Sequence, residues 1–190
     1  MYVTKEKIEL IEHKFGTPSV ITLAQEIGLD EMSMLLGSQK NGRAHDITFF
    51  IFNDERQVAL IRKPFHPPGV YRAPSGGLEP GEDFESGALR EAWEETGLSI
   101  RLEKYLLRVH VIFTGGGHHV PWISHVFTAS RVEGTLSPVD THEIAEARYG
   151  TLEELQGPIR NSLLATGKGL LRYRVSLTDH VVRMLGGMLK

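Results

Sequence analysis

Four glutamates and one arginine between residues 82 and 95 are the side chains of this sequence best suited to chemistry. Glu91, Glu94 and Glu95 have i, i+3 and i+4 spacing, which on a helix places them within about 100° of one another on one face. Carboxylates at this spacing repel one another, and Arg90 can neutralise only part of their charge. Hard oxygen ligands select Mg²⁺ or Mn²⁺ over zinc. We therefore predict a divalent metal site at these three residues, with Glu82 reaching toward it from the preceding loop.

A glycine-rich loop leads into this acidic segment. It reads Gly76-Gly77-Leu78-Glu79-Pro80-Gly81-Glu82. Glycine permits a tight loop and lets the backbone approach a ligand closely. The helix itself is predicted over residues 83–96, with Gly97 as its stop. Its opposite side is expected to pack against the rest of the protein through Leu89, Ala92, Trp93 and Thr96.

Length and composition limit the classes of protein to which this chain can belong. The chain has 190 residues, of which 41% are hydrophobic and 24% charged, as in an ordinary globular domain. The net charge of −3 lacks the basic footprint of a nucleic-acid-binding protein, so no nucleic-acid partner is predicted. Cysteine is absent, which excludes disulfides, thiolate metal sites and cysteine nucleophiles. With no signal sequence or membrane span evident, we expect a cytoplasmic protein without a membrane partner.

Alternating strand and helix signals predict an α/β (α+β) fold in which helices pack on a mixed sheet. Turn residues 53–56 separate two apolar, β-prone runs and predict a hairpin. We place an N-terminal extension at residues 1–43 and the compact domain, with its C-terminal helix, at residues 44–190. The expected helices cover residues 4–14, 23–36, 83–96, a short stretch from Thr151, and 170–185; the expected strands cover 19–21, 46–52, 57–62, 100–113 and 122–129.

The segment Gly76 to Leu98 resembles the Nudix box, G-x5-E-x7-R-E-U-x-E-E-x-G-U, where U is aliphatic. Every specified position is met, with Ala92 as a small variant of U. The box covers 23 residues, and a weaker resemblance extends from about Ala44 to about Leu155. The resemblance to the Nudix hydrolase family implies an α/β/α sandwich with a mixed central sheet.

The same resemblance implies a hydrolase that cleaves the diphosphate linkage in a nucleoside diphosphate joined to another moiety. It implies Mg²⁺ or Mn²⁺ as the cofactor, held by Glu91, Glu94 and Glu95 with help from Glu82. Arg90 would orient the glutamates by ion pairing, and Arg90 and Glu94 therefore count among the predicted catalytic residues. Glu143 is the predicted general base; Glu146 or a box glutamate are the alternatives. Where many family members have glycine, this chain has Ser75, whose carbonyl can also bind a metal.

Substrate recognition is predicted upstream of the box. Arg62 and Arg72, with Lys63, flank a Pro-Gly loop where cations can hold phosphates. Gly76 and Gly77 are expected to lie against the substrate as well. Three aromatic residues either stack on a base or belong to the core: Phe65, Tyr71 and Trp122.

The residues just upstream of the box favour ADP-ribose or a nucleotide sugar as the substrate. Residues 60–65 and 72–77 resemble the strand and loop of ADP-sugar members, while an SQPWPFPxS-like motif and a coenzyme A signature are absent. The predicted partner is thus a small nucleoside diphosphate derivative. The extension is expected either to cover the site or to build a homodimer.

A catalytically silent ligand sensor or regulatory module is the alternative function. Residues 23–29 resemble the first half of a helix-turn-helix, but residues 32–36 contain no Arg or Lys with which to read DNA. The intact acidic positions favour an enzyme over a sensor. Nudix members that isomerise isopentenyl diphosphate depend on a cysteine, which this chain lacks.

Overall fold

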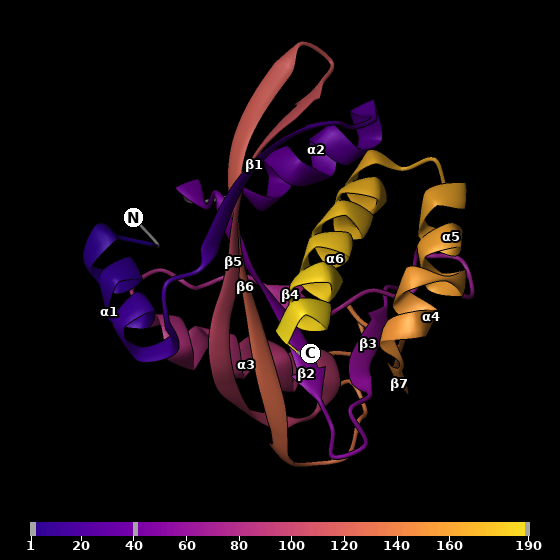
Figure 1. Ribbon diagram of the computed structural model, residues 1–190. Helices are drawn as coiled ribbons and strands as arrows, with labels where there is room; N and C mark the ends of the chain where they lie inside the picture. The colour runs from indigo at the N-terminus through magenta and orange to yellow at the C-terminus, as the bar shows by residue number, and fades with distance from the viewer. Residues whose placement is uncertain (1–2, 40–41, 189–190) are drawn as a thin grey trace.

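The computed structural model describes residues 3–39 and 42–188 as helices that cover both faces of one sheet (Figure 1). The helices are α1 (Lys5–Phe15), α2 (Leu29–Ser38), α3 (Phe84–Thr96), α4 (Leu152–Gln156), α5 (Pro158–Ala165) and α6 (Gly169–Met188). The strands are β1 (Ser19–Glu26), β2 (His45–Phe52), β3 (Val58–Arg62), β4 (Ser75–Gly76), β5 (Ser99–Gly115), β6 (His118–Glu133) and β7 (Glu146–Gly150).

The seven strands form a mixed sheet in the order β1-β5-β6-β2-β3-β7, with the short β4 paired to β2. The β1–β5 and β2–β6 pairs are parallel, and the other pairs are antiparallel. A long hairpin joins β5 to β6 through Gly116 and Gly117, whose φ angles of 56° and 79° only glycine adopts without strain. The predicted mixed sheet is confirmed.

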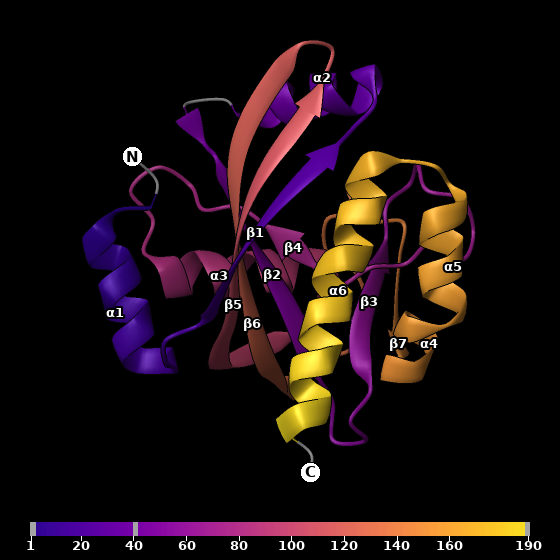
Figure 2. The ribbon, with the colours of Figure 1, turned by 45° about the horizontal axis from the view of Figure 1, so that its top comes forward.

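The helices form two layers, one on each side of the sheet. α1 and α3 pack on one face, and α6 crosses the other face together with α2, α4 and α5 (Figure 2). Strand alternation divides the core accordingly, because successive side chains of a strand point to opposite faces. On β2, Phe49 joins the core beneath α3, while Phe50 joins the core beneath α6. The predicted α/β/α sandwich is confirmed.

The acidic helix α3 begins and ends where its sequence predicts. The Asp83 side chain accepts hydrogen bonds from the amides of Glu85 and Ser86 at the N-terminus. Gly97 ends the helix with a φ of 71°, and its amide donates to the carbonyl of Trp93. A side chain at Gly97 would also meet the carbonyl oxygen of Ser137 at 2.3 Å. These two caps fix the position of the carboxylates along the helix.

Two local predictions are wrong. Residues 23–26, expected in a helix, form the end of β1, because they pair in register with residues 111–114 of β5. Gly28, which falls inside the helix expected at residues 23–36, therefore precedes α2 as its N-cap. Trp93 packs against the protein only in part, because 49% of its surface is exposed. In both cases contacts between distant parts of the chain decide the outcome over local pattern.

The predicted extension and the catalytic domain share this sheet. β1, from the first 43 residues, adds an edge strand to β5, and α1 contacts α3. The boundary between the N-terminal extension and the following domain, placed between residues 43 and 44, stays a prediction. Within residues 3–39 and 42–188, no helix combines the length and the apolar composition that crossing a bilayer requires.

Candidate active site

Arg90 lies at the centre of the acidic face of α3. Its Nε and Nη2 donate to the two carboxylate oxygens of Glu82, each at 2.9 Å. Its Nη1 donates to Glu91 at 3.1 Å and to Glu94 at 2.9 Å. Nη2 also donates to the carbonyl of Gly77 at 3.1 Å, which ties the glycine loop to the helix. The structure thus brings Glu82, Glu91 and Glu94 together around one guanidinium.

The electrostatics of this cluster follow from burial and from Arg90. Hydrogen bonds from the guanidinium lower the pKa of Glu82, and the same bonds raise the pKa of Arg90. Burial raises the pKa of Glu91, although the neighbouring Arg90 opposes that shift. A second cation would therefore be favoured beside Glu91, because it would offset the cost of burying the charge.

Glu95 makes its polar contacts with residues outside this cluster and is almost completely buried. Its Oε2 accepts from the amide of Ser75 at 2.6 Å. Its Oε1 lies 3.7 Å from both Lys63 Nζ and Arg72 Nη2. Burial raises the pKa of Glu95, and the two cations oppose the shift. The predicted residues Arg72 and Glu95 are thus neighbours, and Arg72 is itself buried.

The glycines of the loop leave room for two neighbouring side chains, Glu91 of α3 beside Gly76 and Arg43 beside Gly77. The amide of Gly77 donates to Glu91 Oε1 at 3.1 Å. A Cβ built on Gly76 would lie 1.9 Å from Glu91 Oε2, and one on Gly77 would lie 2.3 Å from Arg43 Nη1. Neither glycine is among the positive-φ residues, so a side chain at either position would conflict with these neighbouring side chains and not with the backbone conformation.

The predicted general base lies at the edge of this site. The Glu143 carboxylate accepts from Lys63 Nζ at 2.6 Å, and 64% of the Glu143 side chain is exposed. Lys63 therefore bridges Glu143 and Glu95. The alternative base, Glu146, accepts instead from Arg62 Nε at 3.2 Å, at the start of β7. Arg62 thus lies on the rim, paired to Glu146, while Glu143 is joined through Lys63 to the buried carboxylate.

Arg174 on α6 is a site residue that the sequence interpretation missed. Its Nη2 donates to Ser75 Oγ at 3.0 Å, and Arg72 Nη1 donates to the same oxygen at 2.9 Å. Its Nη1 lies 3.0 Å from the carboxylate of the buried Asp46, which anchors it. The sequence offered little signal for it, because Arg174 is one of three arginines in α6; the structure places it between the buried Tyr173 and Val175.

The donor set fits a hard divalent cation. Glu91, Glu94 and Glu95 offer carboxylate oxygens from adjacent turns of α3, and Gly76 leaves a cradle against Glu91 that a Cβ would fill. Within the described ranges, no three carboxylate or imidazole groups gather into a ready metal site. The ion pairs explain why the three carboxylates do not gather into one group. Arg90 pairs with Glu91 and Glu94, while Lys63 and Arg72 flank Glu95. The carboxylates therefore form two groups along one helix.

Of the three aromatic candidates, only Phe65 presents its ring to solvent, with 65% of its surface exposed. Tyr71 is buried beneath the guanidinium of Arg148. Trp122 is buried, and its Nε1 donates to Asp46 at 2.8 Å. Tyr71 and Trp122 therefore belong to the core, which was the alternative to base stacking.

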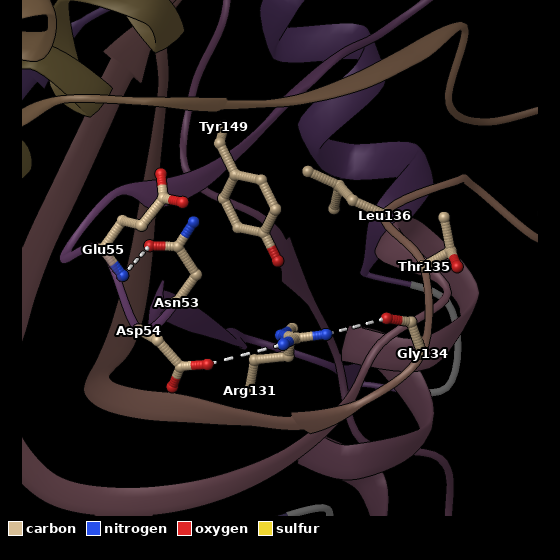
Figure 3. Close-up of a pocket in the computed structure, with 8 residues that line it drawn as sticks. All are labelled: Asn53, Asp54, Glu55, Arg131, Gly134, Thr135, Leu136 and Tyr149. Atoms are coloured by element: carbon tan, nitrogen blue, oxygen red, sulfur yellow. Dashed lines mark hydrogen bonds and ion pairs between the residues drawn. The ribbon is translucent and has the colours of Figure 1, made fainter.

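A separate hollow of about 300 Å³ lies between the β2–β3 turn and the segment that follows β6 (Figure 3). Arg131 projects into it and contacts Asp54 and the carbonyl of Gly134, while the Tyr149 hydroxyl points in from β7. None of the acidic residues of α3 lines this hollow. We therefore assign the chemistry to the α3 face and not to this pocket.

Comparison with known proteins identifies the family. The family model described as NUDIX domain matches residues 42–167. A relative named NAD-capped RNA hydrolase NudC from Stutzerimonas stutzeri is 29% identical over 136 residues, covering 68% of this chain and 42% of that protein. A protein of the same name from Chromobacterium violaceum is 42% identical over 50 residues, covering 26% of this chain and 19% of that protein. The chain thus spans less than half the length of these two relatives.

Among solved structures, a C. elegans Ap4A hydrolase binary complex is 19% identical, with a TM-score of 0.49, and the match covers 76% of this chain and 98% of that one. The Nudix box is complete, it lies on a helix against a glycine loop as the resemblance implied, and the family model covers most of the chain. The chain belongs to the NUDIX domain family.

Proposed function

We propose that this protein is a metal-dependent hydrolase that cleaves the diphosphate linkage of a nucleoside diphosphate joined to another moiety. The observation that carries the proposal is the environment of Glu95. A buried carboxylate lies 3.7 Å from each of two cations, Lys63 and Arg72, at the end of a helix that also presents Glu91 and Glu94. Cations beside a carboxylate cluster suit a substrate that brings both negative phosphates and a metal ion.

The residues divide the work by their chemistry. Arg72 and Lys63 would hold the diphosphate oxygens, and Arg174 would support Ser75 from behind. Glu91, Glu94 and Glu95, assisted by Glu82, would hold Mg²⁺ or Mn²⁺. That cation supplies neutralisation of the diphosphate charge and a lower pKa for a bound water.

Glu143 would accept the proton of the attacking water. Its exposed carboxylate is held at the site edge by Lys63, and a substrate phosphate that drew Lys63 away would free it for this role. Arg90, through its contacts to three carboxylates, would keep them oriented.

We further propose an ADP-linked substrate, either ADP-ribose or another nucleotide sugar. Relatives named NAD-capped RNA hydrolases support a diphosphate linkage of this kind, because NAD also contains ADP joined through a diphosphate. Phe65 supports it too, because its exposed ring lies two residues from Lys63 and is free to stack on a base. The modest net charge of −3 favours a small molecule over a long RNA as the ligand.

Three wider features belong to the same proposal. The cysteine-free composition suits the cytoplasm. A catalytic domain from residue 44 is supported by the family model, which begins at residue 42. A homodimer through the N-terminal 43 residues is supported by the position of β1 at the edge of the sheet, where a second strand can pair.

The test is metal-dependent hydrolysis of a panel, measured as released phosphate after phosphatase treatment. The panel holds ADP-ribose, other nucleotide sugars, dinucleoside polyphosphates, NADH, an NAD-capped RNA oligomer, coenzyme A and nucleoside triphosphates, each with Mg²⁺, Mn²⁺ or EDTA. We expect ADP-ribose or a nucleotide sugar to turn over fastest, and EDTA to abolish turnover.

Glu95→Gln should lower kcat about 100-fold or more, since several kcal/mol of charge stabilisation are removed. Glu153→Gln, an exposed change on α4, is the matched control and should leave kcat unchanged. Metal-dependent binding of a panel compound without turnover of any would instead establish the sensor function.

A further inference from the structure

Arg43, just before β2, is a half-buried arginine to which the described part of the chain offers no carboxylate. Its Nε is buried and lacks a hydrogen-bond partner. Within residues 3–39 and 42–188, no ion pair or hydrogen bond engages its Nη1 or Nη2 either, and neither atom is among the buried unpaired ones, so both reach solvent. A cation that is partly removed from water without a counter-charge is costly. Its position therefore points to an anion that comes from outside the chain.

This guanidinium is held from two sides. Its Cζ lies 5.7 Å from the centre of the Trp122 ring, as in a cation–π contact. Trp122 is itself anchored, because its Nε1 donates to Asp46 at 2.8 Å. On the other side Arg43 adjoins the glycine loop, where a Cβ built on Gly77 would lie 2.3 Å from Nη1 and 2.9 Å from Cζ. The missing side chain of Gly77 thus leaves the space that the guanidinium occupies.

Residues 75–77 present alternate sides to their surroundings, as an extended chain does. The Cβ direction of Gly76 meets a side chain of α3. The opposite side of the loop carries three arginines: Arg43, Arg72 and Arg174. Ser75 accepts hydrogen bonds from the last two, and Gly77 adjoins the first. Two residues of extended chain span about 7 Å, so Arg43 lies roughly that far along the loop from the other two arginines.

Within the described ranges, carboxylates match only two of these three arginines. Arg72 Nη2 lies 3.7 Å from Glu95, and Arg174 Nη1 lies 3.0 Å from Asp46. The diphosphate of the substrate is proposed to lie at the Arg72 end of the row. A substrate that extends along the loop from there brings a further group to Arg43, and the unmatched charge selects a negative one.

We propose that Arg43 is a specificity-determining residue that binds an additional anionic group of the substrate, a phosphate or a carboxylate beyond the scissile diphosphate. This rests on the proposed function, because it takes the diphosphate to lie at Arg72 and Lys63. It narrows the substrate to acidic derivatives of ADP-ribose or of a nucleotide sugar. The planar guanidinium suits either acid, since its N–H groups donate to two oxygens at once. The acid is carried either by the ribose of the nucleoside or by the other moiety.

Two pairs of compounds, each pair differing by one acidic group, test the proposal and distinguish these two positions. ADP-ribose is compared with ADP-ribose 2′-phosphate, and UDP-glucose with UDP-glucuronate. With Mg²⁺, the acidic member of one pair should have a KM at least about tenfold below that of its partner, as expected for a hydrogen bond between charged groups. Arg43→Met removes the charge and should bring that ratio close to one. The loss should appear in the KM of the acidic compound and not in its kcat, because the bound group lies away from the scissile linkage.

Two further variants separate this role from a structural one. Arg172→Met removes the same charge from an exposed position of α6, and as the matched control it should leave the KM ratio unchanged. Arg43→Lys keeps the charge but loses the planar fork, so it should retain part of the preference. Arg43→Met should still unfold cooperatively in urea, since no ion pair within the described ranges is broken.

Trp122 reports binding separately from turnover. The chain has two tryptophans, so Trp93→Phe leaves Trp122, which lies against Arg43, as the single reporter. On rapid mixing, the acidic compound should change its fluorescence before turnover, and Arg43→Met should weaken that binding about tenfold or more.

The outcomes for this inference and for the proposed function are distinct. Preferential binding of an acidic compound without hydrolysis of any compound would contradict the proposed function and support the role of Arg43. Hydrolysis with equal KM values within both pairs, or a preference that survives Arg43→Met, overturns the inference and leaves the hydrolase standing. Neither binding nor hydrolysis of the four compounds would overturn both.

Discussion

Replacing Gly76 with alanine tests whether the glycine loop positions the catalytic carboxylates. The added Cβ would lie 1.9 Å from Glu91 Oε2, 2.0 Å from its Cδ and 2.5 Å from its Cγ. Unstrained contacts between carbon atoms need about 3.5–4.0 Å, so the Glu91 carboxylate must move by about 1.5 Å. That movement breaks its hydrogen bonds to the Gly77 amide and to Arg90 Nη1, both 3.1 Å long.

The expected cost is divided unequally between stability and activity. A glutamate side chain can rotate away, and Arg90 keeps its bonds to Glu82 and Glu94, so the free energy of unfolding should fall by only about 1–3 kcal/mol. A misplacement of about 1 Å in a catalytic group costs about 100-fold in rate. Gly76→Ala should therefore reduce kcat by about 100-fold while the protein still folds.

Urea unfolding and steady-state kinetics on the preferred panel compound measure the two effects. Gly37→Ala is the matched control, since nothing lies within 4 Å of its Cβ position in α2, and it should leave kcat unchanged. In a Glu91→Ala background the side chain that would clash with the new Cβ is absent. Gly76→Ala should then lower the free energy of unfolding by much less than in the parent protein. Equal destabilisation in both backgrounds, or an unchanged kcat, would refute the reasoning.

Three further predictions concern stability, each measured by urea denaturation. Arg174→Met should lower the free energy of unfolding by about 3 kcal/mol, because the buried Asp46 loses its cation; Arg174→Lys should recover part of this. Burial lowers the pKa of His125 to about 3 and of His45 to about 4, below the ordinary 6.5. As the pH falls, these histidines therefore become protonated in the unfolded chain before they do in the folded protein. The free energy of unfolding should be constant above about pH 6.5. Between about pH 6.5 and about pH 4 it should fall by up to about 1.4 kcal/mol per pH unit for each histidine. A His125→Phe variant should show a shallower decline between pH 6.5 and pH 5, and an equal slope would contradict the assignment. Gly97→Ala should cost about 3 kcal/mol, from the φ of 71° and from the Ser137 carbonyl 2.3 Å from the new Cβ, whereas a change below 0.5 kcal/mol would show that the cap yields easily.

The sequence was sufficient to predict features that depend on short spacing. Glu91 and Glu94 lie on one face because the helical period dictates it, and Gly97 ends the helix because it adopts positive φ. The mixed sheet also followed from the alternation of elements. What the spacing did not reveal is that Glu95 turns from the Arg90 cluster toward Lys63.

Contacts between distant segments account for the features that were missed. Arg174 reaches Ser75 from a helix almost 100 residues later in the chain. Residues 23–26 form a strand only because β5 offers a partner. Trp93 has the spacing of a packing residue but stays 49% exposed. Each of these outcomes depends on tertiary packing, which local periodicity does not encode.

The parallel pairing of β1 with β5 sets the timing of folding during synthesis. Ser19 pairs with Leu107, and His45 in β2 pairs with Ile123 in β6, so both partners are made about 80 to 90 residues later. At a synthesis rate of about 5–20 residues per second, β1 waits roughly 4 to 18 seconds for its partner. During that interval its backbone groups are unpaired and open to other chains. The emerging chain is therefore most exposed to aggregation before β5 and β6 leave the ribosome, and a slowed ribosome between residues 26 and 107 should lower the yield of folded protein.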